Sequence, residues 1–305
     1  MNPVERATTV AAAPLRLVGG FAAPARVDMA RTVRRAIGIR EERPPMATDP
    51  LEAYAPPGGM ARLVHGDLPA MLIGGVTALL LQTLHPLAMA GVAEHSGYQE
   101  DPLGRLRRTA SFVGTTTFGT VAEAEAAIAQ VQRVHRRVRG IAPDGRAYSA
   151  DDPELVTFIH VAEVASFLAS SQRYGSRALS PDECDRYYEE VAPVALALGA
   201  TWVPRSAAEV ESYLLRMRPD LYARPQAKAA PDWLLRGVAR RPTERAVYSL
   251  VLAAAVGVLP GWARRELGLS IAGPLDLLFD TAAVTPLTRG LSAALRWMVT
   301  PPVTS

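Results

Sequence analysis

The side chains best suited to chemistry in this chain are its histidines. There are five of them, His65, His85, His95, His135 and His160, and all lie within the first 160 residues. Histidine titrates near neutral pH and is the commonest side-chain ligand for metals. Their clustering is the main indication of where a functional site is built.

His135 has the surroundings that an iron ligand of haem needs. Apolar spacing predicts a helix over residues 121–139, in which His135 lies on or beside the apolar side. The apolar neighbours are Val131, Val134 and Val138, and the flanking cations are Arg133, Arg136, Arg137 and Arg139. A haem ring needs an apolar slot and its propionates need cations, so the pattern suits an axial haem ligand. A core-edge histidine on a solvated arginine-rich helix is the alternative, and spacing alone favours it.

Two other histidines are candidates for the wall of a cofactor pocket. His85 directly precedes Pro86, and His160 lies one helical turn before Glu163. A lone helical histidine is more often a hydrogen-bonded core residue, and this interpretation is preferred for His85. The predicted cofactor-binding residues are His135, His85, His160 and Arg139.

A polar pair on the preceding predicted helix could hold an oxygen ligand. Arg105 and Thr109 are four residues apart and share one helix face, with Arg108 beside them. A buried guanidinium next to a hydroxyl can bind an oxygen ligand or a carboxylate. Phe112 and Phe118 favour burial of this helix. A solvated basic face is an equally weighted alternative.

Several other kinds of site are excluded. The chain contains no pair of Glu-x-x-His segments for a helical di-iron site and no His-Glu-x-x-His zinc motif. It also lacks a Gly-x-Ser-x-Gly elbow and a glycine-rich phosphate loop. Its only cysteine, Cys184, rules out an intramolecular disulfide and a site with several cysteine ligands.

Composition limits the partners. The 305 residues include 33 basic and 30 acidic side chains, a net charge of +3, and Lys228 is the only lysine. No basic run is interleaved with aromatic residues, so nucleic acid is not an expected partner. With 49% hydrophobic residues the chain can form a large core. No signal peptide is recognisable, and the expected location is cytoplasmic.

Helix signals dominate the chain, which predicts an all-α fold. Capping boxes are expected at Thr120 with Glu123, Ser180 with Glu183 and Ser206 with Glu209, and capping acids precede proline at Asp101 and Asp152. Gly140, Gly175 and Gly199 lie where helix ends are expected. The predicted helices are 68–84, 86–97, 102–117, 121–139, 153–174, 181–198, 207–217, 243–257 and 273–297, and no strand is predicted.

One large helical domain is expected, with about nine or more helices. It covers residues 59–298, after an arm or cover at 1–58 with one helix near 26–39, and before a tail at 299–305. The apolar stretch 68–93 contains His85 and Pro86 and is interpreted as a buried helix pair rather than a membrane span. The shorter stretch 246–259 is interpreted as a core helix, and peripheral contact with a membrane is the weaker alternative.

A set of short segments resembles a known family. These segments are Gln82-Thr-Leu-His85-Pro86, Gly91-Val-Ala-Glu-His95-Ser96, Asp101-Pro-Leu-Gly-Arg105, Arg108-Thr109, Phe118-Gly119 and His135-Arg-Arg-Val138-Arg-Gly140. In order and spacing they resemble the catalytic domain shared by MpaB-type oxygenases and the bacterial rubber oxygenase called latex clearing protein. The resemblance extends over roughly residues 60–290.

The resemblance implies an all-helical, globin-like domain that holds one haem b. It assigns the proximal iron ligand to His135 and the distal arginine and threonine to Arg105 and Thr109. The rubber oxygenase has a lysine just before that threonine, and here the position is Arg108, which stays protonated and is a poor ligand. That enzyme's glutamate base corresponds by interval to Met89, while Glu94 and Glu100 lie nearby.

The predicted function is that of a haem-dependent oxygenase. With O2 as co-substrate, it would act on a hydrophobic small molecule, with cleavage of a carbon–carbon double bond as the candidate reaction. Two rival functions remain. One is a haem protein without oxygenase turnover, such as a sensor, a carrier or a peroxidase-like enzyme. The other is a non-haem helical module that binds lipid. The sequence specifies no oligomeric state.

Overall fold

The computed structural model describes residues 46–95, 102–238, 242–269 and 284–299. The chain divides into two compact units, and the larger, Arg43–Ala293, contains almost all of the described residues. The predicted helix near 26–39, most of the predicted arm, and residues 273–283 of the last predicted helix lie outside the described part.

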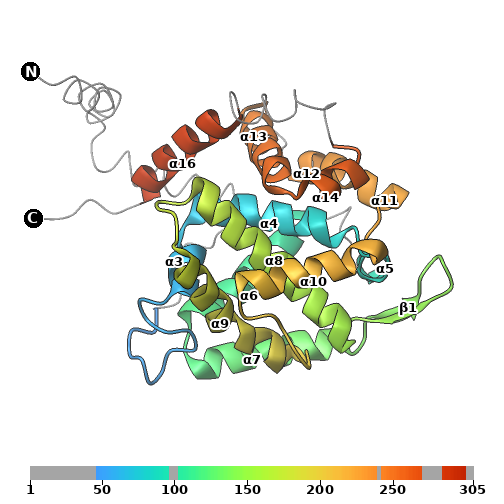
Figure 1. Cartoon of the computed structure of the whole chain (residues 1–305), viewed down its shortest axis with the longest axis horizontal. Coiled ribbons are helices and arrows are strands. Elements are labelled where there is room, and N and C mark those ends of the chain that lie inside the picture. The colour runs from blue at the N-terminus through green and yellow to red at the C-terminus, as the bar shows by residue number, and fades with distance from the viewer. Residues whose placement is uncertain (1–45, 96–101, 239–241, 270–283, 300–305) are drawn as a thin grey trace, which may run out of the picture. The chain divides into compact units, whose positions relative to one another are not determined.

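The larger unit is built from helices, which confirms the all-α prediction (Figure 1). They are α3 (Met60–Gly66), α4 (Leu68–Gln82), α5 (Pro86–His95), α6 (Pro102–Phe118), α7 (Val121–His135), α8 (Pro153–Tyr174), α9 (Pro181–Leu198), α10 (Ala207–Met217), the 3-10 turn η2 (Arg218–Asp220), α11 (Pro225–Lys228), α12 (Ala230–Val238), α13 (Pro242–Val258) and α14 (Gly261–Glu266). The last described helix, α16 (Thr285–Val299), continues beyond this unit.

The capping residues predicted for α7, α8 and α9 begin these helices as expected, and the predicted cap at Asp101 lies outside the described residues. Complete capping boxes form at Thr120 before α7 and at Ser180 before α9, and Asp152 accepts hydrogen bonds from the first amides of α8. At α10 the box is half formed: Ser206 accepts from the Glu209 amide, but the Glu209 carboxylate accepts from the amide of Arg205.

The prediction of one helix over 121–139 and of no strands is wrong. Helix α7 ends at His135, and the chain enters an antiparallel hairpin of β1 (Arg139–Ile141) and β2 (Ala147–Ser149). The turn between them contains Gly145 at φ +86°, a left-handed conformation that glycine adopts without strain. Gly140 therefore lies in a strand and caps no helix, whereas Gly199, at φ +117°, ends α9 as predicted.

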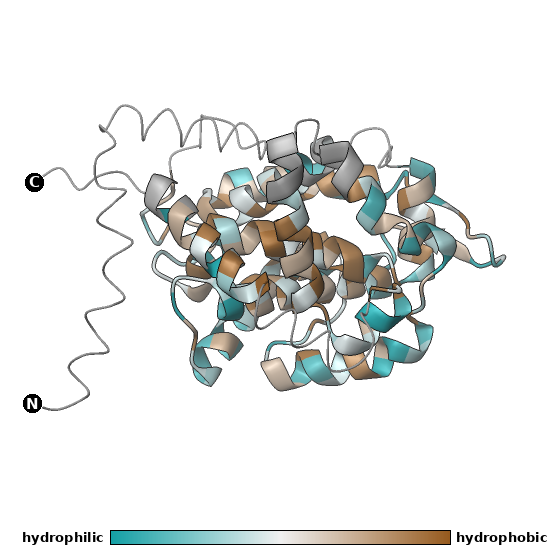
Figure 2. Cartoon of the chain, turned by 90° about the horizontal axis from the view of Figure 1, so that it is seen from above, coloured by the Kyte–Doolittle hydropathy of each residue, from teal (hydrophilic) through white to brown (hydrophobic). Residues whose placement is uncertain are grey.

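Helices α4 and α8 form the centre of the core. Gly74 on α4 lies against Phe167 on α8 so closely that an added Cβ would stand 3.0 Å from the Phe167 Cα. The Ser170 hydroxyl donates to the Ala70 carbonyl at 2.7 Å, which joins the same two helices. Figure 2 shows that hydrophobic residues gather on the central helices and hydrophilic residues on the peripheral ones.

The apolar stretches are core helices. The first, residues 68–93, forms α4 and α5, as predicted for a buried pair. In α13, Val251, Ala254 and Ala255 are buried, as predicted for a core helix. Among the described helices, α8 is by itself long and apolar enough to cross a membrane, and 72% of its most apolar window is buried.

Candidate functional site

His135 is the last residue of α7, where the chain turns toward the hairpin. The turn is closed by the amide of Val138, which donates to the His135 carbonyl at 3.0 Å. The imidazole is partly buried, and burial lowers its pKa, while the nearby Asp151 opposes this by raising it. His135 is therefore held in the neutral form that a metal ligand requires.

The Nδ1 atom of His135 is buried and has no hydrogen-bond partner within the described part of the chain. An unpaired polar atom in a protein interior is unfavourable and calls for an explanation. A coordinated metal ion would satisfy a neutral ring nitrogen. The described residues contain no group of three or more histidine, cysteine or acidic side chains able to hold a metal ion. Haem needs only one protein ligand on its proximal side, so a single histidine is sufficient for it.

Exposed cations follow His135 in the chain. Arg139 donates from Nε and Nη2 to the carbonyl of Arg136, at 3.1 and 2.6 Å, which fixes its side chain across the turn. Arg136 and Arg137 are exposed and form no ion pair with any described carboxylate. This end of α7 therefore carries positive charge that an anionic cofactor can neutralise.

Helix α5 and the hairpin enclose the turn after His135. A Cβ on Gly91 would stand 3.4 Å from the Tyr148 ring and 3.6 Å from Val138, so these segments are closely packed. The Tyr148 hydroxyl donates to Glu94 and lies 3.1 Å from His95 Nε2. Burial first, and then Glu94, raises the pKa of Tyr148 to about 12, so its hydroxyl remains a donor.

These contacts bear on the search for a catalytic base. Glu94 is engaged by Tyr148, and Met89 is buried on α5 and cannot titrate. Glu100 lies outside the described residues. No described residue on α5 is thus a free carboxylate base.

Helix α6 lies beside α7 and is joined to it by a two-residue connection. Arg105, Arg108 and Thr109 share this helix, as predicted, but the side chain of Arg105 lies outside the described set. Arg108 and Thr109 are exposed, so at this end of the helix the structure agrees with the solvated basic face, the equally weighted alternative. Burial of the helix is confirmed at the other end, where Phe118 is buried.

His85 occupies the start of α5. Its Nδ1 accepts from the Ala88 amide at 3.3 Å, and its ring lies 4.8 Å from that of Phe158. Burial first, and then the charge of Arg146, lowers the pKa of His85 to about 4. His85 therefore has a structural role at a helix start.

A second polar cluster lies between α3, α6, α8 and α9. His65 is hydrogen-bonded through Nδ1 to Thr117 at 2.7 Å and through Nε2 to the Tyr187 hydroxyl at 2.9 Å. It borders a cavity of about 30 Å³, lined also by His160 and Glu163 and large enough for about one or two water molecules. His160 thus borders a cavity that His135 does not line.

Burial perturbs every titratable group of this cluster toward its neutral form. It lowers the pKa of His65 to about 3 and that of His160 to about 4, and it raises the pKa of Glu163 to about 7. Sequence reasoning noted the spacing of His160 and Glu163 but missed the pairing of His65 with Tyr187. No sequence signal indicates contact across that separation.

One of the comparisons with known proteins finds a match. The family described as "ER-bound oxygenase mpaB/B'/Rubber oxygenase, catalytic domain" matches residues 62–297. No curated protein and no solved structure shows a significant match to the chain. The family match includes every site residue discussed above and covers well over half of the chain, and we conclude that the protein belongs to the mpaB and rubber oxygenase catalytic-domain family.

Proposed function

We propose that the protein is a haem b-dependent oxygenase in which His135 is the iron ligand. Family membership supports oxygenase activity. The observation that carries the haem assignment is the buried, unpartnered Nδ1 of His135 on an imidazole kept neutral by burial. A buried ring nitrogen without a hydrogen-bond partner calls for an explanation, and a bound metal ion is the explanation that we propose.

The residues around His135 have distinct proposed roles. His135 holds the iron, and the guanidinium groups of Arg136, Arg137 and Arg139 pair with the two propionates. Haem b, when bound, supplies the binding and activation of O2. The family resemblance assigns Arg105 and Thr109 on α6 to the oxygen-binding side, and Arg108 stays protonated and can serve as a donor rather than as a ligand.

The proposed substrate is a hydrophobic small molecule with a carbon–carbon double bond. Cleavage of that bond by O2 would add one oxygen atom to each carbon and give two carbonyl products, so no external electron donor is required. With Met89 in place of a carboxylate, we assign no base to this position of α5.

The test compares three full-length proteins: wild type, His135→Ala and His95→Ala. His95 is the matched control, because it is also a helical histidine but is exposed and hydrogen-bonded to Tyr148. After haem reconstitution, wild type and His95→Ala should show a Soret band and stoichiometric iron, and His135→Ala should lose both. A wild type that remains colourless while helical by circular dichroism would refute the haem assignment.

Oxygenase turnover needs a separate measurement. An oxygen electrode with polyisoprene oligomers and terpenoids as substrates should record O2 consumption by the wild type, with carbonyl products identified by mass spectrometry. A haem-loaded protein that consumes no O2 with any of these would retain the cofactor assignment and remove the proposed reaction.

A further inference from the structure

Trp202 is held by its loop in an unusually exposed position. It lies between α9 and α10, and 47% of its surface is exposed. Its carbonyl accepts a hydrogen bond from the Thr157 hydroxyl at 3.0 Å, and the next residues, Val203 and Pro204, are buried. The Trp202 carbonyl and the two residues that follow it are thus held in place, and the indole is half exposed to water, although burial of an aromatic ring is strongly favourable.

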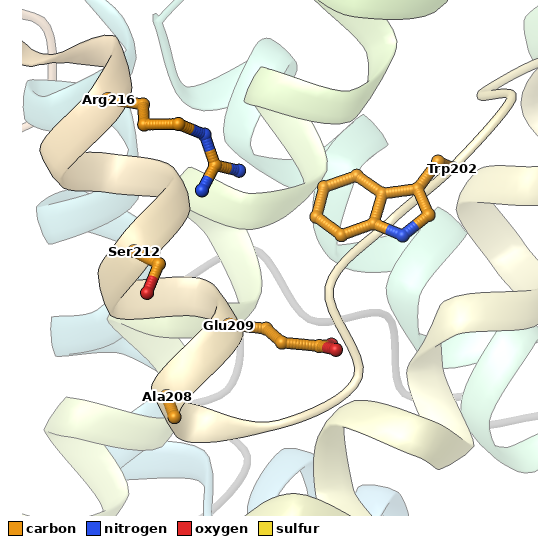
Figure 3. A pocket seen from close by; sticks show the side chains of 5 residues that line it. All are labelled: Trp202, Ala208, Glu209, Ser212 and Arg216. Carbon is orange, nitrogen blue, oxygen red and sulfur yellow. The ribbon is translucent and has the colours of Figure 1, made fainter.

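The indole forms one wall of a pocket beside α10 (Figure 3). Ala208 and Ser212 are one helical turn apart, and their small side chains leave a depression along the helix. All five lining residues are exposed, so the pocket is an open surface depression, and its volume is about 320 Å³. A flat apolar group of about ten non-hydrogen atoms suits this space and the face of the indole.

The two charged side chains of the pocket, Arg216 and Glu209, differ in whether they are already engaged by the protein. Arg216 forms no ion pair with any described carboxylate, and its guanidinium lies 6.0 Å from the centre of the Tyr213 ring. In Figure 3 this guanidinium extends into the space between α10 and Trp202. Glu209 already accepts the Arg205 amide at 2.7 Å, so one of its oxygens is occupied. The pocket therefore has an available cation at the Arg216 end and a fixed negative charge nearer the start of α10.

We propose that this pocket binds a flat, apolar monocarboxylate. The apolar body packs on the indole of Trp202 and over Ala208, and the carboxylate pairs with Arg216, where two N–H groups can donate to two oxygens. A second carboxylate at the far end of the ligand would be repelled by Glu209. The proposal is independent of the oxygenase function, because none of these residues belongs to the His135 site.

The test is a binding titration of full-length protein by fluorine NMR with ring-fluorinated phenylpropionate. We expect a Kd of roughly a few millimolar for a ligand of this size. The neutral phenylpropanamide should bind at least about fivefold more weakly because it loses the charge-assisted pairing. The analogue with a second carboxylate on the ring should also bind more weakly than phenylpropionate.

Matched variants separate this pocket from general anion binding. Arg216→Gln should weaken phenylpropionate binding at least about fivefold, and Arg218→Gln, at an exposed arginine outside the pocket, should leave it unchanged. Ser212→Leu, which fills the depression at an exposed position, should abolish binding while circular dichroism stays unchanged. Equal binding of acid and amide, equal effects of the two arginine variants, or no binding by the wild type at tens of millimolar would overturn the proposal.

Discussion

His65 and His135 are two helical histidines that differ in whether the protein hydrogen-bonds their ring nitrogens. Burial lowers the pKa of both, so neither burial nor protonation state distinguishes them. His65 has both ring nitrogens hydrogen-bonded to the protein, and His135 has a buried Nδ1 with no described partner. The fold completes the hydrogen bonding of the first histidine by itself, whereas it leaves Nδ1 of the second without a described partner. Hydrogen-bond satisfaction therefore distinguishes the two histidines where titration does not, and the proposed role of His135 as a ligand rests on that difference.

The largest expected effect is that of His135→Leu. It removes the proposed iron ligand, so haem retention through gel filtration should be lost. The stability of the haem-free protein should stay the same or rise by about 1 kcal/mol, because a buried unpaired polar atom is replaced by an apolar group. Urea unfolding of the haem-free wild type and variant provides the comparison. A strongly destabilised haem-free variant would mean that His135 has a structural role like that of His65.

Substitution of His65 by leucine should have the opposite effects: the stability should fall and haem binding should persist. His65→Leu leaves the hydroxyls of Thr117 and Tyr187 without their partner in the core, and the free energy of unfolding should fall by about 3 kcal/mol. Tyr187→Phe, which removes one of the two hydrogen bonds, should cost about 1 kcal/mol. Haem binding by folded protein should persist in both. Loss of the Soret band from folded His65→Leu would connect the two sites and contradict their separation.

Glu163 supplies a pH-dependent test of the His65 cluster. Burial raises its pKa from 4.5 to about 7, so the folded protein holds this proton more tightly than the unfolded chain. The carboxyl contribution to stability is therefore present below pH 4.5, falls as the pH rises toward 7, and stays lost above it. Glu163→Gln removes this dependence and should stabilise the protein by about 3 kcal/mol at pH 8, with little gain at pH 4.

The histidines of the cluster titrate in the same experiment but affect both proteins alike. The lowered pKa values of His65 and His160 mean that the unfolded chain binds more protons below pH 6.5, so stability falls with acidification in wild type and variant. The difference between the two curves isolates Glu163. A constant difference across the pH range would show that this carboxyl does not titrate near neutrality in the folded protein.

The smallest expected effect is at the start of α7. Thr120→Ala removes the capping hydrogen bond from the Glu123 amide and should cost about 1 kcal/mol of stability. The Soret band of the folded protein should be unchanged. If this variant lost haem as fully as His135→Leu, haem binding would depend on the stability of α7 and not on the His135 side chain itself.

The sequence predicts local structure well where one short segment determines it. The capping boxes at Thr120 and Ser180 place two helix starts correctly, because each box satisfies amides within four residues. The hairpin after α7 was missed because strands of three residues show no clear alternation and the preceding arginines continue a helical pattern.

The candidate site is predictable only in part, because some of its features depend on tertiary contacts and not on one short segment. His135 is found from its local pattern and from the family resemblance. Its unpaired nitrogen is a property of the tertiary structure at the end of α7, which local pattern does not specify. The bond between His65 and Tyr187 joins residues 122 positions apart, and only tertiary structure reveals it.

That separation also affects the order in which the protein assembles. Closing a long loop costs entropy before its contacts are gained, so contacts between distant segments tend to form late, and those within a helical hairpin early. Helices α6 and α7 are a contiguous hairpin over residues 102–135, whereas the His65 cluster requires α3 and α9 to meet. We therefore expect the helix that carries His135 to form before the His65 cluster closes, so that the proposed iron ligand is in place early in folding.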